Sequence, residues 1–214
     1  LQKEGRYDEM LALWRSATRK MSLISIPITV VFAVLAREFI VGLFTADYAE
    51  AVPIFIAFLV LIPRQAIPYG AVTRAFGLTR YIMWVCVAAL LVAVGLAFLL
   101  VRPLGLLGPA IAVIAGQWIV TEMQVAKTRK LLGVSWTRLL PWGDLGRMTA
   151  LALALAAVLV VAHARAAGPP LAVLIVGCTL YLAAFYALGA RLGIVRRAEI
   201  REAAGMLRRL GVCW

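Results

Sequence analysis

The sequence predicts an all-α protein, a polytopic membrane helix bundle of about six transmembrane helices. Apolar residue types make up 64% of the 214 residues, whereas soluble domains contain about 45–50%. Only 15% of the residues are charged, against about a quarter in soluble domains. The apolar residues gather in six runs of about the 20 residues that a helix needs to cross a bilayer. A soluble fold of this length could not bury so much apolar surface, so we predict an integral membrane protein.

Each apolar run is predicted to be a helix, because backbone polar groups in lipid must pair within their own segment. Pro63 and Pro68 interrupt the second run, where each proline removes a backbone donor and favours a bend. The six runs cover about residues 21–44, 51–76, 81–101, 105–126, 147–163 and 170–190.

The more polar segments between and beside these runs define the predicted organisation. We expect a four-helix part of one lobe at 21–126 and two additional helices at 147–190. Residues 1–20 form an amphipathic lead-in, 127–146 a loop and 191–214 a basic tail. Because the chain begins at Leu1 and not at Met, we expect that a further N-terminal part precedes it.

Basic residues alternate between the two ends of the predicted helices. Most of them lie in the lead-in, around 74–80, in the 127–146 loop and in the tail, whereas the opposite gaps hold few. By the positive-inside rule, both termini are predicted to be cytoplasmic. The net charge of +12 is therefore assigned to topology and to contact with anionic phospholipid, and not to nucleic acid.

Arg64 is the main candidate functional residue, because it lies about halfway along the second run. An arginine at the bilayer centre costs about 3 kcal/mol by insertion scales, so it should face a wet cavity or a partner. A guanidinium suits a phosphate or pyrophosphate, since its fork donates two parallel hydrogen bonds. With Gln65 and Gln117, Arg64 is predicted to bind substrate; pairing with an acidic residue on a missing helix is the structural alternative.

Glu122 is the second candidate, for coupling to a proton or cation or for an ion pair with Arg74 or Arg80. Arg37 is placed near the outer interface, in a structural role. The sequence contains no Ser/His/Asp arrangement, phosphate-binding loop or H-E-x-x-H motif. Because these catalytic motifs are missing, we do not expect an enzyme. The three cysteines have no metal-ligand spacing, so we predict no metal or cofactor site.

Three stretches resemble the C-terminal half of polysaccharide flippases, the O-antigen and exopolysaccharide transporters of the multidrug/oligosaccharidyl-lipid/polysaccharide superfamily. Residues 43–51, LFTADYAEA, resemble the family's Leu-Phe-Gly-x-x-Tyr-x-x-Ala loop, with Thr45 in place of glycine. Residues 103–112, PLGLLGPAIA, resemble its Pro-x-Gly-x-x-Gly-Ala-Ala segment, with Pro109 in place of alanine. The opening from Glu4 to Arg15, followed by Ile26-Pro27, resembles the loop and helix that begin this half. The resemblance covers about residues 1–135, and the last two runs match only in number.

The resemblance implies two lobes around a central, often cationic cavity that works by alternating access. It implies movement of an undecaprenyl-pyrophosphate-linked oligosaccharide across a bacterial cytoplasmic membrane, with the N-terminal half as partner. A peptidoglycan lipid-precursor flippase shares the pyrophosphate and stays open as an alternative. A cation-coupled multidrug exporter would require a carboxylate near the bilayer centre, and a membrane enzyme would require a large outer loop.

Overall fold

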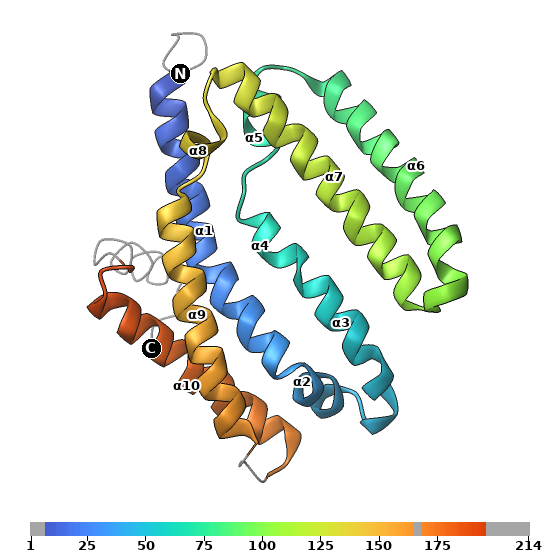
Figure 1. Cartoon of the computed structure of the whole chain (residues 1–214), viewed down its shortest axis with the longest axis vertical. Coiled ribbons are helices and arrows are strands. Elements are labelled where there is room, and N and C mark those ends of the chain that lie inside the picture. Colours follow the sequence, from blue (N-terminus) through green and yellow to red (C-terminus); the bar gives the residue numbers. More distant parts are fainter. Residues whose placement is uncertain (1–6, 165–167, 196–214) are drawn as a thin grey trace, which may run out of the picture.

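All regular elements that the structure describes are helices, and no strand occurs within residues 7–164 and 168–195, the ranges that the computed structural model describes (Figure 1). Five helical stretches are long and apolar enough to cross a membrane. They are Tyr7–Val34, Ala46–Gln65, Thr79–Leu104, Trp142–His163 and Pro170–Arg191. The all-α class is therefore confirmed, and the five apolar helices indicate a membrane protein.

Within the described residues the number of such helices is five and not the six predicted. The fourth predicted run corresponds to α7 (Leu107–Leu132), which is not among the helices that are long and apolar enough to cross a membrane. Its length of 26 residues equals that of α6 (Thr79–Leu104), so composition and not length is the reason. Polar side chains from Gln117 onward, including Glu122 and Lys127, lower the apolar content of its second half.

The first apolar run continues an earlier helix. α1 (Tyr7–Val34) passes without interruption through the predicted boundary at residue 20, because the lead-in already has helical spacing. Leu35 separates α1 from α2 (Ala36–Leu43), and its amide still donates to the Val31 carbonyl oxygen at 3.0 Å. The first six residues of the lead-in lie outside the described residues.

The second apolar run is broken into four short elements. They are the 3-10 helix η1 (Ala46–Ala51), α3 (Val52–Leu59), α4 (Leu61–Gln65) and α5 (Ala71–Ala75). Residues 66–70 between α4 and α5 are not helical. Pro68 lies in this break, as expected for a residue that disfavours helical geometry in its predecessor and has no amide hydrogen.

α6 and α7 form a closely packed antiparallel hairpin. Gly108 and Gly116 lie on the α7 face that meets α6, together with the fully buried Ala112. A Cβ on Gly108 would lie 2.3 Å from the Leu100 carbonyl oxygen, and one on Gly116 would lie 2.9 Å from the Ala93 Cβ. Small residues at four-residue spacing thus allow the two backbones to approach, as in membrane helix pairs.

The connection after α7 is shorter than the predicted 127–146 loop. Gly133, with φ of 65°, ends α7 in a left-handed conformation, as is common beyond helix C-termini. α8 (Trp136–Leu139) follows, and α9 (Trp142–His163) has begun before residue 146. α10 (Pro170–Arg191) covers the sixth run, and the predicted tail lies outside the described residues from position 196.

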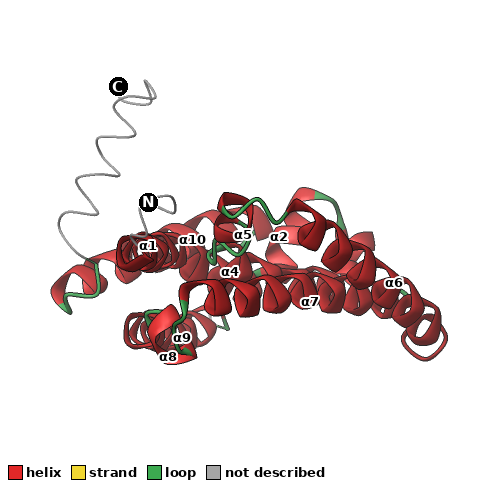
Figure 2. Cartoon of the chain, turned by 90° about the horizontal axis from the view of Figure 1, so that it is seen from above, coloured by secondary structure: helices red, strands yellow, loops and turns green. Residues whose placement is uncertain are grey.

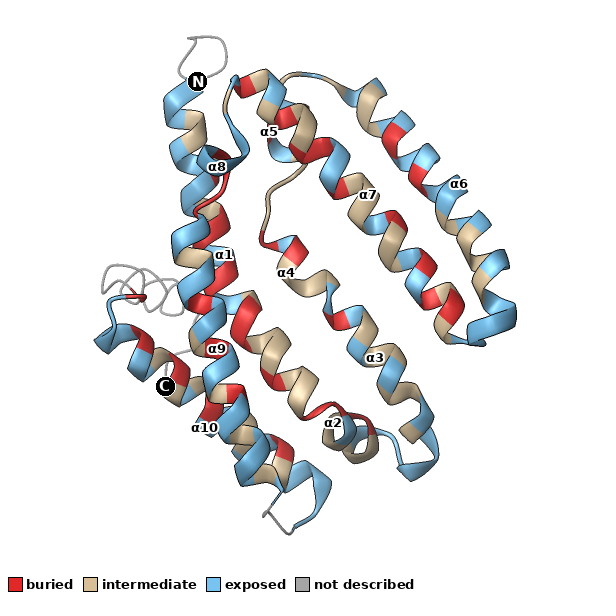
Figure 3. Cartoon of the chain, viewed as in Figure 1, coloured by how far each residue is buried: buried red, intermediate tan, exposed pale blue. Residues whose placement is uncertain are grey.

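α9 and α10 pack against α1 around Met148, Ala152 and Phe185. The buried Arg19 of α1 joins this group, since its guanidinium pairs with Asp144 of α9 and donates to the Ile194 carbonyl oxygen at 2.6 Å. Seen from above, α6 lies at one edge of the elongated molecule, and α4 and α7 lie between α6 and α1 (Figure 2). Most of α6 is exposed, whereas α1 carries many buried residues (Figure 3).

The chain runs alternately up and down, which places particular connections at the same end. The start of α1, the α4–α5 break, α8 and the start of α6 lie toward one end of Figure 1. η1, the α6–α7 turn and the α9–α10 connection lie toward the other end. The basic segments around 74–80 and 127–138 are therefore on the N-terminal side of the bundle, as the charge alternation requires.

Candidate functional site

Arg64 lies at the end of α4, just before the break in the second run. The apolar helical stretch to which it belongs ends at Gln65, so Arg64 is not in the middle of its own helix as predicted. It is nevertheless beside the middle of α7, because its Nε donates a hydrogen bond to the Oγ1 of Thr121. The early end of the stretch follows from the break at Pro68.

The Arg64 side chain is buried, with only 4% of its surface exposed. Its guanidinium carbon lies 4.7 Å from the centre of the Tyr69 ring, a distance typical of a cation–π contact. Thr121 in turn donates to the Gln117 carbonyl oxygen at 3.1 Å. The Nη2 atom of Arg64 is buried and has no hydrogen-bond partner among the described residues. A buried cation with a free donor is costly unless a ligand completes its contacts.

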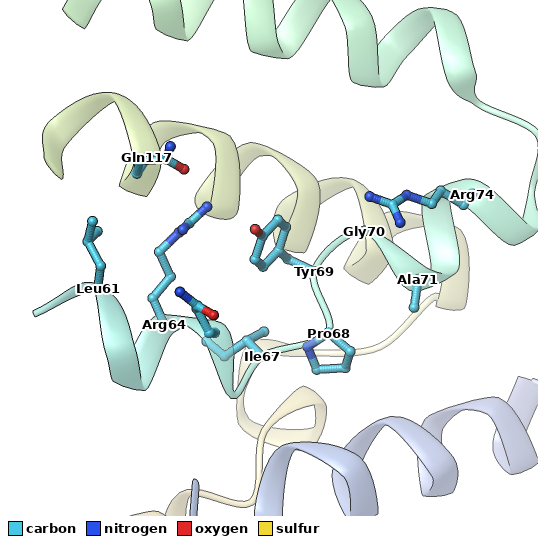
Figure 4. A pocket seen from close by; sticks show the side chains of 10 residues that line it. Leu61, Arg64, Ile67, Pro68, Tyr69, Gly70, Ala71, Arg74 and Gln117 are labelled. Carbon is cyan, nitrogen blue, oxygen red and sulfur yellow. The ribbon is translucent and has the colours of Figure 1, made fainter. Parts of the chain in front are cut away.

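An open cavity of about 590 Å³ adjoins Arg64. Its wall comes from α4, the non-helical break, α5 and one residue of α7. In Figure 4, Tyr69 lies between the Arg64 and Arg74 side chains. The lining residues are Leu61, Arg64, Gln65, Ile67, Pro68, Tyr69, Gly70, Ala71, Arg74 and Gln117.

The cavity wall is cationic. Arg64 and Arg74 both line it, and none of its described lining residues is acidic. Neither arginine has an ion pair among the residues that the structure describes. Cavities of this volume accept small molecules, and two guanidinium groups favour a ligand with phosphate or carboxylate oxygens.

Gly70 positions Arg74 at this wall. A Cβ on Gly70 would lie 3.4 Å from the Nε of Arg74 and 3.3 Å from the Oε1 of Gln124. Thr73 donates to the same Gln124 oxygen at 3.2 Å. The absent side chain at position 70 therefore lets the guanidinium lie close to the loop backbone, beside the cavity.

A stripe of four polar residues on α7 faces this region. Their spacing of four, three and four residues places them on one side of a helix. Three of them, Thr121, Gln124 and Thr128, are at most 3% exposed, and Gln117 reaches the cavity. The complete stripe is Gln117, Thr121, Gln124 and Thr128.

The structure therefore brings together the three residues predicted to bind substrate, Arg64, Gln65 and Gln117. Sequence reasoning missed the place of Arg74 at the cavity, which it had assigned only to coupling or ion pairing. It also missed Tyr69, Thr121 and Gln124. The regular spacing of polar residues within the apolar α7 run is the sequence signal that could have found the last two.

The predicted ion pair of Glu122 with Arg74 or Arg80 is not present. Glu122 is exposed on α7 and has no ion pair among the described residues. Its position one residue after Thr121 explains this, because neighbouring residues on a helix point about 100° apart. Arg80 and Arg37 are likewise exposed, and neither has an ion pair within the described ranges.

Glu38 also forms an ion contact, with its Oε1 3.1 Å from the Nε2 of His163. This contact joins α2 to the end of α9. Among residues 7–164 and 168–195, no group of three or more His, Cys, Asp or Glu side chains could hold a metal ion.

Comparison of the chain with known proteins gives no relatives: no family model, curated protein or solved structure matches it.

Proposed function

We propose that this chain is part of a flippase that moves an undecaprenyl-pyrophosphate-linked oligosaccharide across a bacterial cytoplasmic membrane. In this proposal the chain is a transporter and not an enzyme, and both of its termini are cytoplasmic. An N-terminal half of the transporter completes the cavity. The transported oligosaccharide is then used at the cell envelope to build a polysaccharide, such as O-antigen or lipopolysaccharide.

The observation that carries the proposal is the buried Arg64 with a free donor beside an open cavity. Within a bundle of apolar helices, such a residue is a functional candidate because its burial without a ligand is unfavourable. A pyrophosphate presents several oxygens that accept from the fork of a guanidinium. The lipid-linked substrate supplies this group together with an acyl tail that the surrounding bilayer accommodates.

The non-helical break at residues 66–70 further supports a transport role. In membrane transporters, interrupted helices commonly form the substrate site, and non-helical backbone at membrane depth occurs where it lines a cavity. Here the break supplies Tyr69 and Gly70 to the cavity wall.

The cationic wall distinguishes the proposal from a cation-coupled drug exporter. A cationic drug would meet two arginines and no carboxylate among the described lining residues. A peptidoglycan lipid-precursor flippase carries the same pyrophosphate, so the choice between the two lipid substrates depends on cell phenotype.

Replacement of Arg64 by Ala in the complete gene tests the proposal. The expected result is a loss of surface polysaccharide of at least about tenfold with normal membrane levels, because a charged contact is worth about 1.5–3 kcal/mol. Arg64→Lys keeps the charge but not the fork and should restore export only in part. Arg102→Ala is the matched control, since Arg102 is exposed at the far end of α6.

Normal surface polysaccharide in the Arg64→Ala strain, at normal membrane levels, would remove Arg64 from the mechanism and contradict the proposal. Normal polysaccharide combined with a cell-wall defect would identify the peptidoglycan precursor as the substrate instead.

A further inference from the structure

A second cluster of basic residues, none of which lines the cavity, lies where α6 begins and α7 ends. Tyr81 of α6 donates its hydroxyl to the Met123 carbonyl oxygen of α7 at 2.8 Å. The Nζ of Lys127 lies 5.3 Å from the centre of the same ring. These two contacts fix the start of α6 beside the last turns of α7. We define the hairpin basic end as Arg80, Tyr81, Lys127 and Lys130.

The cations of the hairpin basic end are not neutralised by any residue that the structure describes. Arg80 and Lys130 are exposed, Lys127 is half-buried, and none has an ion pair within the described ranges. Lys130 follows Lys127 by three residues, so both lie on the same side of α7. The only acidic residue in α6 and α7 is Glu122, more than one turn before Lys127. The hairpin basic end therefore attracts an anionic group.

An apolar stripe begins directly below this cluster on α6. Trp84, Leu91 and Phe98 follow Arg80 by 4, 11 and 18 residues, which places all four on one helix face. Their side chains are 65%, 68% and 76% exposed. The surface thus joins a cationic head region to a long exposed apolar strip, which matches an amphiphile with an anionic head and an acyl chain.

The composition of α6 favours lipid over another protein helix at this face. Between Met83 and Val101 the helix carries no charged residue and no Ser, Thr, Asn or Gln. The face of α7 that meets protein differs, because it is built from Gly108, Ala112 and Gly116, which let backbones approach. Bulky, uniformly apolar side chains and an aromatic residue near the charged end are typical of a lipid-facing surface.

We propose that the hairpin basic end binds the headgroup of an anionic phospholipid, with an acyl chain along the Trp84–Leu91–Phe98 strip. Lys127 and Lys130 contact the phosphate from α7 and Arg80 contacts it from α6. Tyr81 is a positioning residue, since its hydrogen bond to α7 holds the two helices and Lys127 in place. The site shares no lining residue with the Arg64 cavity and does not depend on the proposed transport function.

Native mass spectrometry of the whole chain in detergent, titrated with phosphatidylglycerol or phosphatidylcholine, tests this site. We expect the first phosphatidylglycerol to bind about tenfold more tightly than phosphatidylcholine, because each nearby basic residue adds to the attraction of anionic lipid. The Arg80→Gln/Lys127→Gln/Lys130→Gln variant should lose this preference. Arg102→Gln, at the other end of α6, is the matched control and should keep it.

Helical content measured by circular dichroism must remain unchanged in these variants. An Arg80→Lys/Lys127→Arg/Lys130→Arg variant preserves charge and should keep the preference even if the triple Gln variant fails to fold. Equal affinity for the two lipids in the unchanged chain would overturn the proposal. An unchanged preference for phosphatidylglycerol in the folded triple Gln variant would also overturn it. The three cations would then serve a protein partner or membrane topology instead.

Discussion

The buried polar contact between Arg64 and Thr121 is the central feature at the scale of single residues. Thr121 accepts from the guanidinium and donates to the Gln117 carbonyl oxygen, so it orients the arginine from α7. The Tyr69 ring supports the guanidinium at 4.7 Å. With Nε held in this way, Nη2 is buried and has no hydrogen-bond partner among the described residues.

Replacing Thr121 by Val keeps the shape of the side chain and removes its hydroxyl. We expect a loss of about 1–3 kcal/mol in stability, because the Arg64 Nε donor is left buried without a partner. Thermal unfolding in detergent measures this loss. Thr179→Val is the matched control, since Thr179 is exposed and bonds only within its own helix. Equal melting temperatures for the two variants would contradict the role assigned to Thr121.

Sequence alone placed Arg64, Gln65 and Gln117 in one site, because an arginine in an apolar run and its polar neighbours are visible without coordinates. The partners of Arg64 were not predictable in the same way. Thr121 and Arg74 reach this region only through the register between α4, the break and α7. That register depends on side-chain packing between segments more than 50 residues apart in sequence.

At the scale of elements, the interrupted second run and the α6–α7 hairpin decide the architecture. Pro63 and Pro68 indicated the interruption in the sequence, and the structure places the non-helical residues at 66–70. The continuous α1 was not predicted, since a change from polar to apolar composition need not end a helix. The close packing of the hairpin depends on glycines of α7. Their role is visible only in the structure, where α6 lies against them.

Gly108→Ala should weaken the α6–α7 hairpin. The new Cβ would lie 2.3 Å from the Leu100 carbonyl oxygen, so backbone must move, at a cost of about 1–3 kcal/mol. Gly95→Ala provides the control, because a Cβ there meets nothing within 4 Å. Chemical denaturation in detergent should show a lower midpoint for Gly108→Ala only. An unchanged midpoint would mean that the two helices are not so closely packed.

At the scale of the whole molecule, the alternating path of the chain separates a basic end from a nearly neutral one. The connections at 66–78 and 133–141 lie toward the same end as the start of α1 (Figure 1). Retention of basic residues on the cytoplasmic side then predicts that η1 faces the outside of the membrane.

Cysteine labelling in intact cells measures this orientation. In a chain whose Cys86, Cys178 and Cys213 are replaced by Ala, Asp47→Cys should react with a membrane-impermeant maleimide, whereas Ser135→Cys should react only after permeabilisation. Both positions are exposed, so access and not burial decides the outcome. The reverse pattern would invert the topology, and labelling of both in intact cells would refute membrane insertion of the intervening helices.

Binding of a soluble isoprenyl pyrophosphate to the detergent-solubilised chain tests the central claim most directly. Isothermal titration with farnesyl pyrophosphate should show binding that weakens at least about tenfold in Arg64→Ala, because a charge-assisted bidentate contact is lost. Farnesol should bind weakly to both proteins, since it lacks the pyrophosphate. Equal affinity of the unchanged chain and of folded Arg64→Ala for farnesyl pyrophosphate would contradict an anion site at Arg64.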